Sequence, residues 1–250
     1  NTKKTYLTNV MGTIELLELV KKIDTVNQIL IFTSDKVYRN LSGKILKEEE
    51  NLGGLDPYSS SKSSQDIIAN SYKVSFFKNS KNIIIVRAGN IIGGGDFEYS
   101  RLIPEIFLAF QKNNKIFLRN PNAIRPWQHI FDVINALLAI IFKSSRKIEN
   151  NSITFNVGPN KNSNIKVISL VNKLIKNFDN LKFGFQYKVK FNETKILKLS
   201  NKKIKEKIKW KPNISISKAL KLTAIWYKEF NNNQNKIYEF SLDQIKNYFK

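Results

Sequence analysis

Three short stretches of the chain are almost continuously apolar and end in polar or small residues. They are VNQILIFTSD (26–35), KNIIIVRAGNII (81–92) and NSITFNVGP (151–159). Continuous apolar runs rich in β-branched residues are typical of parallel strands that are buried on both faces of a sheet. The pattern therefore predicts three strands of one parallel sheet.

Apolar residues between these runs recur at helical spacing. Helices are predicted over 6–23, 59–77, 101–113 and 131–145. Alternation of strand and helix predicts an α/β fold, namely a Rossmann-like doubly wound parallel sheet with right-handed crossovers. Ligands of such sheets bind beyond the carboxyl ends of the strands, so the residues after each apolar run are the place to look for a site.

The pattern changes from about residue 160 and predicts a smaller lobe. It contains an expected helix over 164–178, a strand-like segment over 183–192 and a helix over 214–230. The polar stretch NNNQNK (231–236) is expected to be a linker, and 241–250 a short final helix.

Composition narrows the possible chemistry. Hydrophobic residues make up 42% of the 250 residues, which indicates a folded protein. The chain has no cysteine and a single histidine, His129, so we expect no disulfide, thiol nucleophile or metal site. The longest apolar runs, such as ALLAIIF (136–142), are too short to span a bilayer, and no signal segment is recognised. We expect a cytoplasmic protein with no membrane partner.

The net charge of +22, from 42 basic and 20 acidic residues, raises the possibility of nucleic-acid binding. The lysines are scattered along a chain that is also rich in Asn and Ile, which favours compositional bias over a binding stripe. We therefore expect no nucleic-acid partner, although some basic residues could serve an anionic small substrate.

The stretch YSSSK (58–62) places Tyr58 and Lys62 one helical turn apart. Asp56 is a plausible N-cap and Pro57 suits the first position of a helix. A nearby ammonium favours a phenolate, and a phenolate can take a proton from an alcohol. The alternative is an exposed Tyr and Lys that share a helix face by chance.

A second polar stretch, TSDK (33–36), follows the first predicted strand. It places a hydroxyl, a carboxylate and an amine where sheets of this kind bind ligands. The alternative is an ordinary polar loop, but the two stretches together, in this order, favour a site.

Longer motifs carry a resemblance to a known family. The chain resembles the extended short-chain dehydrogenase/reductases and is most similar to their CDP-glucose 4,6-dehydratase branch, from about residue 5 to 230. Asp35-Lys36 matches that branch, whereas related dehydratases have a glutamate after the acidic or hydroxyl residue and epimerases lack the pair. The motifs are TNVMGT (8–13), TSDKVY (33–38), GGLDPYSSSK (53–62), RAGNIIGGGDF (87–97), RLIPE (101–105) and, most specific, RNPNAIRPWQHI (119–130).

The resemblance implies an NAD cofactor, a CDP-sugar substrate and a role in lipopolysaccharide O-antigen biosynthesis. Tyr58 would take the proton of the sugar 4-hydroxyl while hydride passes from C4 to NAD, and Ser34 would bind that hydroxyl. Lys36 would then remove the C5 proton and Asp35 would protonate the departing 6-hydroxyl. Lys62 would also bind the nicotinamide ribose.

The resemblance also assigns residues to binding. The cofactor would contact Asn9, Thr33, Tyr58, Lys62, Ala88 and Ile91, and the substrate would contact Asn90, Arg101, Leu102, Arg119 and Arg125. Solvated surface arginines and an exposed Asn9 are the simpler alternatives. Trp127 is expected to pack in the core, and His129 to be a hydrogen-bonded structural residue.

The same resemblance implies three parts of the chain. The remainder of an NAD-binding domain would span 1–160, with a substrate-lobe insertion around 93–128. A substrate-binding lobe would follow over 161–235, and a C-terminal helix over 236–250. Helices 6–23 and 59–77 would form a homodimer interface.

The chain departs from the family pattern at its start. Relatives carry roughly 90 to 100 further residues there, including a glycine-rich dinucleotide-binding turn. We therefore expect an exposed sheet edge and little or no activity from this chain alone. An epimerase of the same fold and an inactive remnant remain the alternatives.

Overall fold

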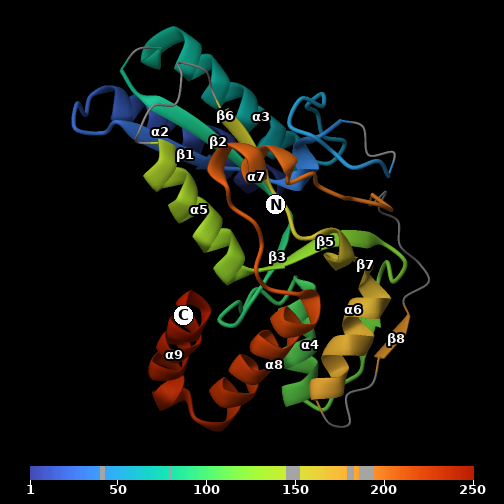
Figure 1. Ribbon diagram of the computed structural model, residues 1–250. Coiled ribbons are helices and arrows are strands. Elements are labelled where there is room, and N and C mark those ends of the chain that lie inside the picture. The colour runs from blue at the N-terminus through green and yellow to red at the C-terminus, as the bar shows by residue number, and fades with distance from the viewer. Residues whose placement is uncertain (40–42, 79, 145–152, 179–182, 186–193) are drawn as a thin grey trace. The chain divides into compact units, whose positions relative to one another are not determined.

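A computed structural model describes residues 1–39, 43–78, 80–144, 153–178, 183–185 and 194–250 (Figure 1). The chain forms two compact units. The first unit comprises Asn1–Gly89, Asn135–Gly158 and Leu197–Lys211, and the second comprises Asn90–Ile134, Pro159–Ile196 and Pro212–Lys250.

The sheet of the first unit has three parallel strands in the order β1-β2-β6. Strand β1 spans Gln28–Phe32, β2 spans Asn82–Ala88 and β6 spans Ile153–Val157. All three come from the predicted apolar runs, and the α/β class with a parallel sheet is confirmed. In this arrangement β1 is an edge strand.

Helices cover the two faces of this sheet. On one face, Leu17 and Val20 of α2 and Ala69 of α3 pack against alternate isoleucines of β1 and β2. The part of α5 that belongs to this unit lies across the opposite face (Figure 1). The bounds are α1 Thr2–Tyr6, α2 Gly12–Lys21, α3 Pro57–Tyr72, α5 Ile130–Ser144 and α7 Lys202–Ile208.

Two π-helical turns interrupt the regular helices of this unit. The turn Leu7–Met11 joins α1 to α2 without a break, and Lys73–Phe77 continues α3. A π-helical turn inserts a residue and so changes which side chains face a neighbouring element, and such turns are frequent at functional sites.

The second unit combines short strands with four helices. In its three-stranded sheet β5 pairs with β3 in parallel and with β7 in antiparallel orientation, and β4 pairs with β8. Its core joins Phe107, Trp127, Leu170, Leu220 and Tyr227. The bounds are β3 Asn90–Ile92, α4 Leu102–Gln111, β4 Ile116–Leu118, β5 Ile124–His129, β7 Asn164–Lys166, α6 Val167–Leu174, β8 Phe183–Phe185, α8 Ile216–Asn232 and α9 Ile237–Phe249.

Three expectations need correction. The run 81–92 is two strands, because the chain leaves the first sheet at Gly89 and β3 joins the second unit. The segment Leu197–Lys211, expected in the 161–235 lobe, belongs to the first unit, where α7 contacts β6. The expected linker 231–236 is largely helical, since α8 runs to Asn232 and a 3-10 turn follows. Of the expected strand 183–192, the residues after 185 lie outside the described part.

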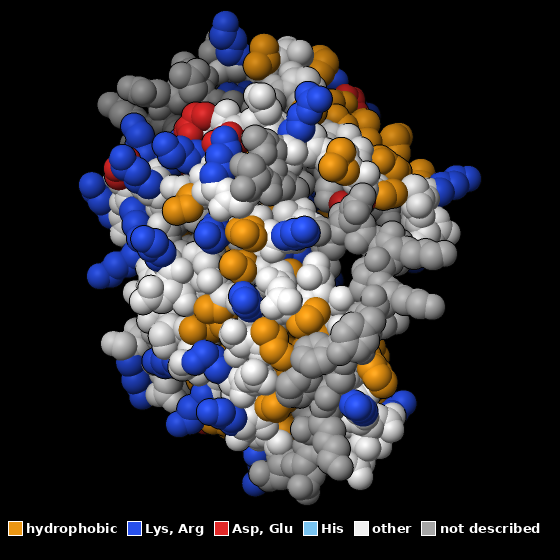
Figure 2. Space-filling view, turned by 90° about the vertical axis from the view of Figure 1, so that its right-hand side faces the viewer, with side chains coloured by type: hydrophobic (Ala, Val, Ile, Leu, Met, Phe, Trp, Pro, Cys, Tyr) orange, Lys and Arg blue, Asp and Glu red, His pale blue; other side chains and the backbone are white. Residues whose placement is uncertain are grey.

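The basic residues do not form a single stripe on the face that Figure 2 shows. Figure 2 shows Lys and Arg side chains scattered over one face, separated by apolar and neutral surface, with few acidic side chains.

Within the described ranges, no helix combines the length and apolar character needed to cross a membrane.

Candidate active site

Helix α3 begins where the sequence predicts. The Asp56 side chain accepts a hydrogen bond from the Ser59 backbone N–H (3.0 Å), and Pro57 occupies the first turn. The loop before it passes so close that a Cβ on Gly54 would lie 2.3 Å from the Ser59 carbonyl carbon. The cap and the close-packed loop fix the first turn of α3, which carries Tyr58.

Tyr58 and Lys62 both lie at the carboxyl end of β1. Lys62 Nζ donates to the carbonyl of Phe32, the last residue of that strand (3.3 Å). The Tyr58 ring centroid is 5.9 Å from Lys36 Nζ, and the Tyr58 side chain is 43% exposed. Among the described residues its hydroxyl has no hydrogen-bond partner, so it is available to a ligand.

The residues after β1 form a 3-10 turn that holds three predicted groups. Ser34 Oγ accepts from the Lys36 backbone N–H (3.2 Å) and donates to Asp35 Oδ1 (3.1 Å). Lys36 Nζ lies 3.9 Å from the same carboxylate oxygen. The Asp35 side chain is 3% exposed and that of Lys36 31% exposed, so the carboxylate is desolvated while the amine reaches solvent.

The predicted cofactor residues of this unit lie around the same strand end. Thr33 is anchored to β2, because its hydroxyl and its backbone N–H both donate to the carbonyl of Val86. Ala88 is the buried last residue of β2. Asn9 Nδ2 donates to Ser61 Oγ (2.9 Å), which in turn donates to the Tyr58 carbonyl, so Asn9 stabilises the turn of α3 that carries Tyr58.

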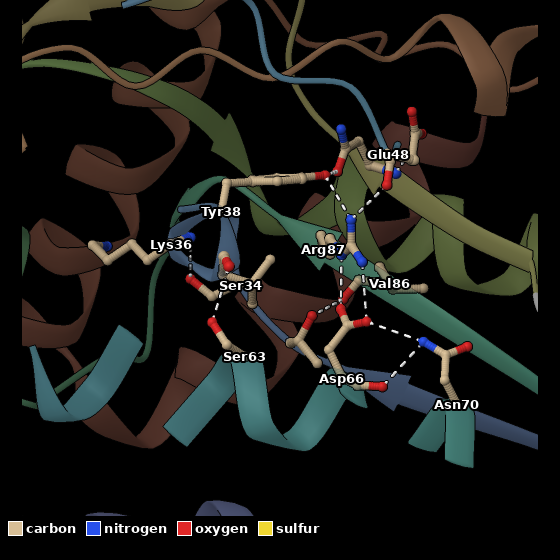
Figure 3. A network of polar contacts seen from close by, with 12 residues as sticks. Ser34, Lys36, Tyr38, Glu48, Ser63, Asp66, Asn70, Val86 and Arg87 are labelled. Carbon is tan, nitrogen blue, oxygen red and sulfur yellow. Dashed lines mark hydrogen bonds and ion pairs between the residues drawn. The ribbon is translucent and has the colours of Figure 1, made fainter. Parts of the chain in front are cut away.

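A buried polar network beside these groups was missed by the sequence analysis (Figure 3). Arg87 on β2 forms a bidentate pair with Asp66 on α3, with Nε–Oδ2 at 2.7 Å and Nη2–Oδ1 at 3.0 Å. Arg87 Nη1 also donates to Tyr38 Oη and to the Glu48 carbonyl. The Tyr38 hydroxyl donates to Asn156 Oδ1 on β6, whose backbone N–H donates to the Glu48 carboxylate.

This network, the Arg87 cluster, joins the parts of the chain that carry the candidate catalytic groups. Asp66 lies on the helix of Tyr58 and Lys62, and Tyr38 follows the turn of Ser34–Lys36. Burial raises the pKa of Tyr38 to about 12, against the opposing effect of the Arg87 charge, so this phenol remains protonated. Tyr38 and Arg87 fall within the motifs quoted above, but nothing local showed that they meet.

The second unit contains a pocket of about 440 Å³. Its lining includes every predicted residue that belongs to this unit: Asn90, Ile91, Arg101, Leu102, Arg119 and Arg125. It also includes residues that were not predicted, namely Asp96, Ser100, Glu105, Phe117 and Asn120. Each of these lies within a few residues of a predicted one, and that proximity is the signal that could have found them.

The pocket arginines differ in exposure. Arg101 pairs with Asp96 (3.0 Å) and Arg119 with Glu105 (3.7 Å), and the two arginine side chains are 66% and 57% exposed. Arg125 is buried and donates to the carbonyl of Ile124. Guanidinium groups on a pocket wall suit a phosphate-bearing ligand, because their planar forks bind oxyanions with two hydrogen bonds.

Two further predictions in this unit are confirmed. Trp127 is buried in the core, although it also contributes to the pocket wall. His129 is buried and its Nδ1 accepts from the Phe131 backbone N–H (3.3 Å). Burial lowers the pKa of His129 to about 4, so it is a neutral structural residue near pH 7.

Comparison with known proteins places these features in context. A family model described as GDP-mannose 4,6 dehydratase matches residues 1–223. The CDP-glucose 4,6-dehydratase of Salmonella typhimurium is 33% identical over 233 residues, which are 90% of this chain and 65% of the relative. The UDP-glucose 4-epimerase of Mycoplasma genitalium is 27% identical over 70% of this chain and 55% of its own length. The chain thus spans no more than about 65% of these relatives.

Solved structures share the fold. The dTDP-glucose 4,6-dehydratase from Bacillus anthracis in complex with NAD aligns with a TM-score of 0.76 at 24% identity, over 92% of this chain and 70% of that one. The UDP-glucuronic acid 4-epimerase from Bacillus cereus, in complex with UDP-glucuronic acid and NAD, aligns with a TM-score of 0.77 at 19% identity, over 90% of this chain and 68% of that one. At these identities the likeness concerns the Rossmann-like fold.

Proposed function

We propose a reaction from one premise: the chain belongs to the GDP-mannose 4,6-dehydratase family, within the extended short-chain dehydrogenase/reductases that its motifs predicted. The reaction is conversion of CDP-glucose to CDP-4-keto-6-deoxyglucose. The observation that carries it is the placement of Lys36 at the end of β1, with its Nζ 5.9 Å from the centroid of the Tyr58 ring and 3.9 Å from Asp35 Oδ1. The 33% identical relative is a CDP-glucose 4,6-dehydratase, which supports the choice of nucleotide.

The residues of the first unit fit the nicotinamide end of NAD. Lys62 has three N–H donors and two acceptors among the described residues, Phe32 O and Gln65 Oε1, so one donor remains for a ribose hydroxyl. The Tyr58 hydroxyl is likewise available. Thr33 directly follows β1, and Ala88 is the last residue of the neighbouring strand β2. When bound, NAD would accept the hydride from C4 and supply it again to C6.

The chain's own residues would move the protons. Tyr58 takes the proton of the 4-hydroxyl as C4 becomes a ketone, and Ser34 orients that hydroxyl. The ketone acidifies the C5 hydrogen. Lys36, in its neutral form, removes that hydrogen as a proton while Asp35, in its protonated form, protonates the departing 6-hydroxyl, so that water leaves. Lys36 returns its proton to C5 as C6 is reduced. The proton held by Tyr58 passes through solvent to Asp35, which restores the starting state.

In the second unit, Arg101, Arg119 and Arg125 would bind the diphosphate of the CDP-sugar. All three line the pocket, which has enough room for a nucleotide portion. Asn90 and Leu102 line the same pocket and would also contact the substrate, whereas Ile91 is assigned to the cofactor by the resemblance.

The acid–base half of the reaction can be tested without hydride transfer. CDP-4-keto-6-deoxyglucose already has the ketone, so Lys36 should catalyse exchange of its C5 hydrogen in D₂O. We expect exchange at C5 by NMR, and its loss in Lys36→Met. Lys44→Met is the matched control, since Lys44 is another lysine of the first unit that pairs with a carboxylate, Glu50. An epimerase would instead invert C4 of a CDP-hexose.

Exchange that persists in Lys36→Met would remove Lys36 from the mechanism. Binding of the keto sugar without exchange in the unaltered chain would contradict the dehydratase assignment. Full turnover of CDP-glucose with added NAD is a separate measurement, and we expect little from this chain alone.

We also propose that the chain forms a homodimer through its first helices and α3. Apolar side chains on these helices are exposed, among them Leu7, Met11, Leu19, Ile67 and Val74. A second subunit packed on these helices would remove these apolar side chains from water. Sedimentation should give a dimer that Val74→Asp converts to a monomer. Leu55→Asp is the control, because Leu55 is 97% exposed in a loop; a dimer that survives Val74→Asp contradicts this interface.

A further inference from the structure

The ammonium of Lys62 has a partner that the proposed function does not use. Lys62 Nζ donates to Gln65 Oε1 at 2.9 Å, a shorter contact than the one with the Phe32 carbonyl at 3.3 Å. Gln65 follows Lys62 by three positions on α3, and residues at i and i+3 of a helix lie on the same face. The helix itself therefore places the two side chains next to each other.

The orientation of the Gln65 amide is fixed from the other end. Gln65 Nε2 lies 2.8 Å from Thr13 Oγ1. The hydroxyl of Thr13 already donates its only hydrogen to the Asn9 carbonyl (2.8 Å), so it can only accept from Gln65. The amide NH₂ must therefore face Thr13, and the amide oxygen must face Lys62.

The chain of donors thus runs in one direction, from Lys62 through Gln65 and Thr13 to Asn9. Thr13 is buried, and Asn9 lies in the π-helical turn Leu7–Met11. The side chain of Asn9 also donates a hydrogen bond to Ser61. The π-helical turn and α2 consequently contact α3 at two points, Asn9 with Ser61 and Thr13 with Gln65.

We infer that Gln65 is a positioning residue that presents a hydrogen-bond acceptor to Lys62, and that Thr13 fixes the orientation of the Gln65 amide. The inference rests on the proposed function for its significance, since Gln65 and Thr13 would keep Lys62 protonated and hold its ammonium in position. An acceptor stabilises the ammonium over the neutral amine, and therefore counteracts burial, which lowers the pKa of Lys62.

Other charges around Lys62 are engaged elsewhere. Asp66 pairs with Arg87, Glu18 with Lys21 and Tyr72, and Asp35 with Lys36. Further titratable groups on the elements packed here are Glu15 on α2, Tyr58 on α3, Lys73 in the turn after α3, and Lys3, Lys4 and Tyr6 on α1. Burial is the cause of the lowered pKa of Lys62. The neutral amide of Gln65 is therefore the closest group that can offset burial.

The test measures Lys62 directly and needs neither cofactor nor sugar. The chain is labelled with trace acetic anhydride across a pH series, and the rate at Lys62 is divided by the rate at Lys44 in the same digest. Near pH 8, Gln65→Leu should raise this ratio about fivefold, because loss of an acceptor to a charged donor increases the neutral amine. Gln65→Glu should lower it, and Thr13→Val should raise it less than Gln65→Leu. Thr13→Ser, which keeps the hydroxyl, should match the unaltered chain.

The pH series separates this role from a merely structural one. If Gln65 acts on protonation, the ratios of all variants converge at high pH, where every lysine is neutral. A Gln65→Leu ratio that is unchanged near pH 8, or that stays raised at high pH, contradicts the inference. Because C5 exchange is measured separately, failure of the dehydratase proposal and failure of this one can be told apart.

Discussion

The two units use arginine in opposite ways. In the first, Arg87 is buried, makes a bidentate pair with the fully buried Asp66 and donates from Nη1 to Tyr38 Oη and the Glu48 carbonyl. In the second, Arg101 and Arg119 lie on a pocket wall, more than half exposed, and form ion pairs with Asp96 and Glu105 respectively.

The difference indicates which charges maintain the fold and which are free for a ligand. Four of the five N–H groups of the Arg87 guanidinium donate within the cluster, and removing Asp66 would leave a buried charge without its counter-ion. The pairs of Arg101 and Arg119 are screened by solvent and contribute little, so a diphosphate can replace Asp96 and Glu105 at small cost.

The largest effect is expected from breaking the Arg87 cluster. Asp66→Ala should lower the free energy of unfolding by about 3–5 kcal/mol, because it leaves Arg87 buried and unpaired. Urea unfolding followed by circular dichroism measures this. The double variant Asp66→Leu with Arg87→Met removes both charges and should be less destabilised than Asp66→Ala. A loss below about 1 kcal/mol in Asp66→Ala contradicts the structural role of the cluster.

The buried histidine of the second unit should make stability depend on pH. The pKa of His129 is lowered by burial from 6.5 to about 4, so the unfolded chain binds the proton more readily between these values. The contribution of His129 is complete above pH 6.5 and decreases as the pH falls toward 4, by about 3 kcal/mol in all.

His129→Asn isolates the contribution of His129 protonation to stability, because an asparagine can accept a hydrogen bond from the Phe131 N–H but does not titrate. The difference in unfolding free energy between the two proteins should change across this window. Comparison by difference is needed since burial raises the pKa of Glu48, which favours stability at low pH instead. A difference that is flat with pH shows that His129 is protonated equally in both states.

Local patterns predicted the first unit well. Each apolar run contains a strand, and Asp56 and Pro57 located the start of α3 to the residue, because these signals act within a few positions. The pocket residues Arg101, Arg119 and Arg125 came from motifs, and the structure places them around one cavity.

The missed features depend on distant partners or lack a local pattern. Arg87 meets Asp66 across 21 positions, and Tyr38 meets Asn156 across 118, which no periodicity reveals. Strand β4 has only three residues, and β5 contains Pro126, which normally argues against a strand. Helix α7 is so rich in lysine that its two buried residues, Ile204 and Ile208, gave no clear stripe.

A smaller effect should come from the loop that carries part of the pocket wall. A Cβ on Gly94 would lie 2.1 Å from ring atoms of Trp226 on α8. Trp226 is held by stacking on Phe230 and by a hydrogen bond to Ser241, so it cannot move freely. Gly94→Ala should cost about 1–3 kcal/mol of unfolding free energy. Thermal unfolding checks this, with Gly12→Ala as a control because a Cβ there would lie 3.9 Å from the Leu7 carbonyl oxygen, an ordinary van der Waals contact. Equal stabilities of the two variants would show that Trp226 can adjust.

The smallest effect is expected at the pocket pair that contrasts with Asp66. Asp96→Asn removes the partner of Arg101, yet both side chains reach solvent, so the free energy of unfolding should change by no more than about 0.5 kcal/mol. The same change frees Arg101 for an anionic ligand, and calorimetry should show CDP-glucose bound at least as tightly as by the unaltered chain. Arg101→Met should weaken binding without loss of stability. Weaker binding in Asp96→Asn would mean that the carboxylate positions Arg101 for the ligand, and the two arginine environments would then differ in exposure but not in their need for a fixed partner.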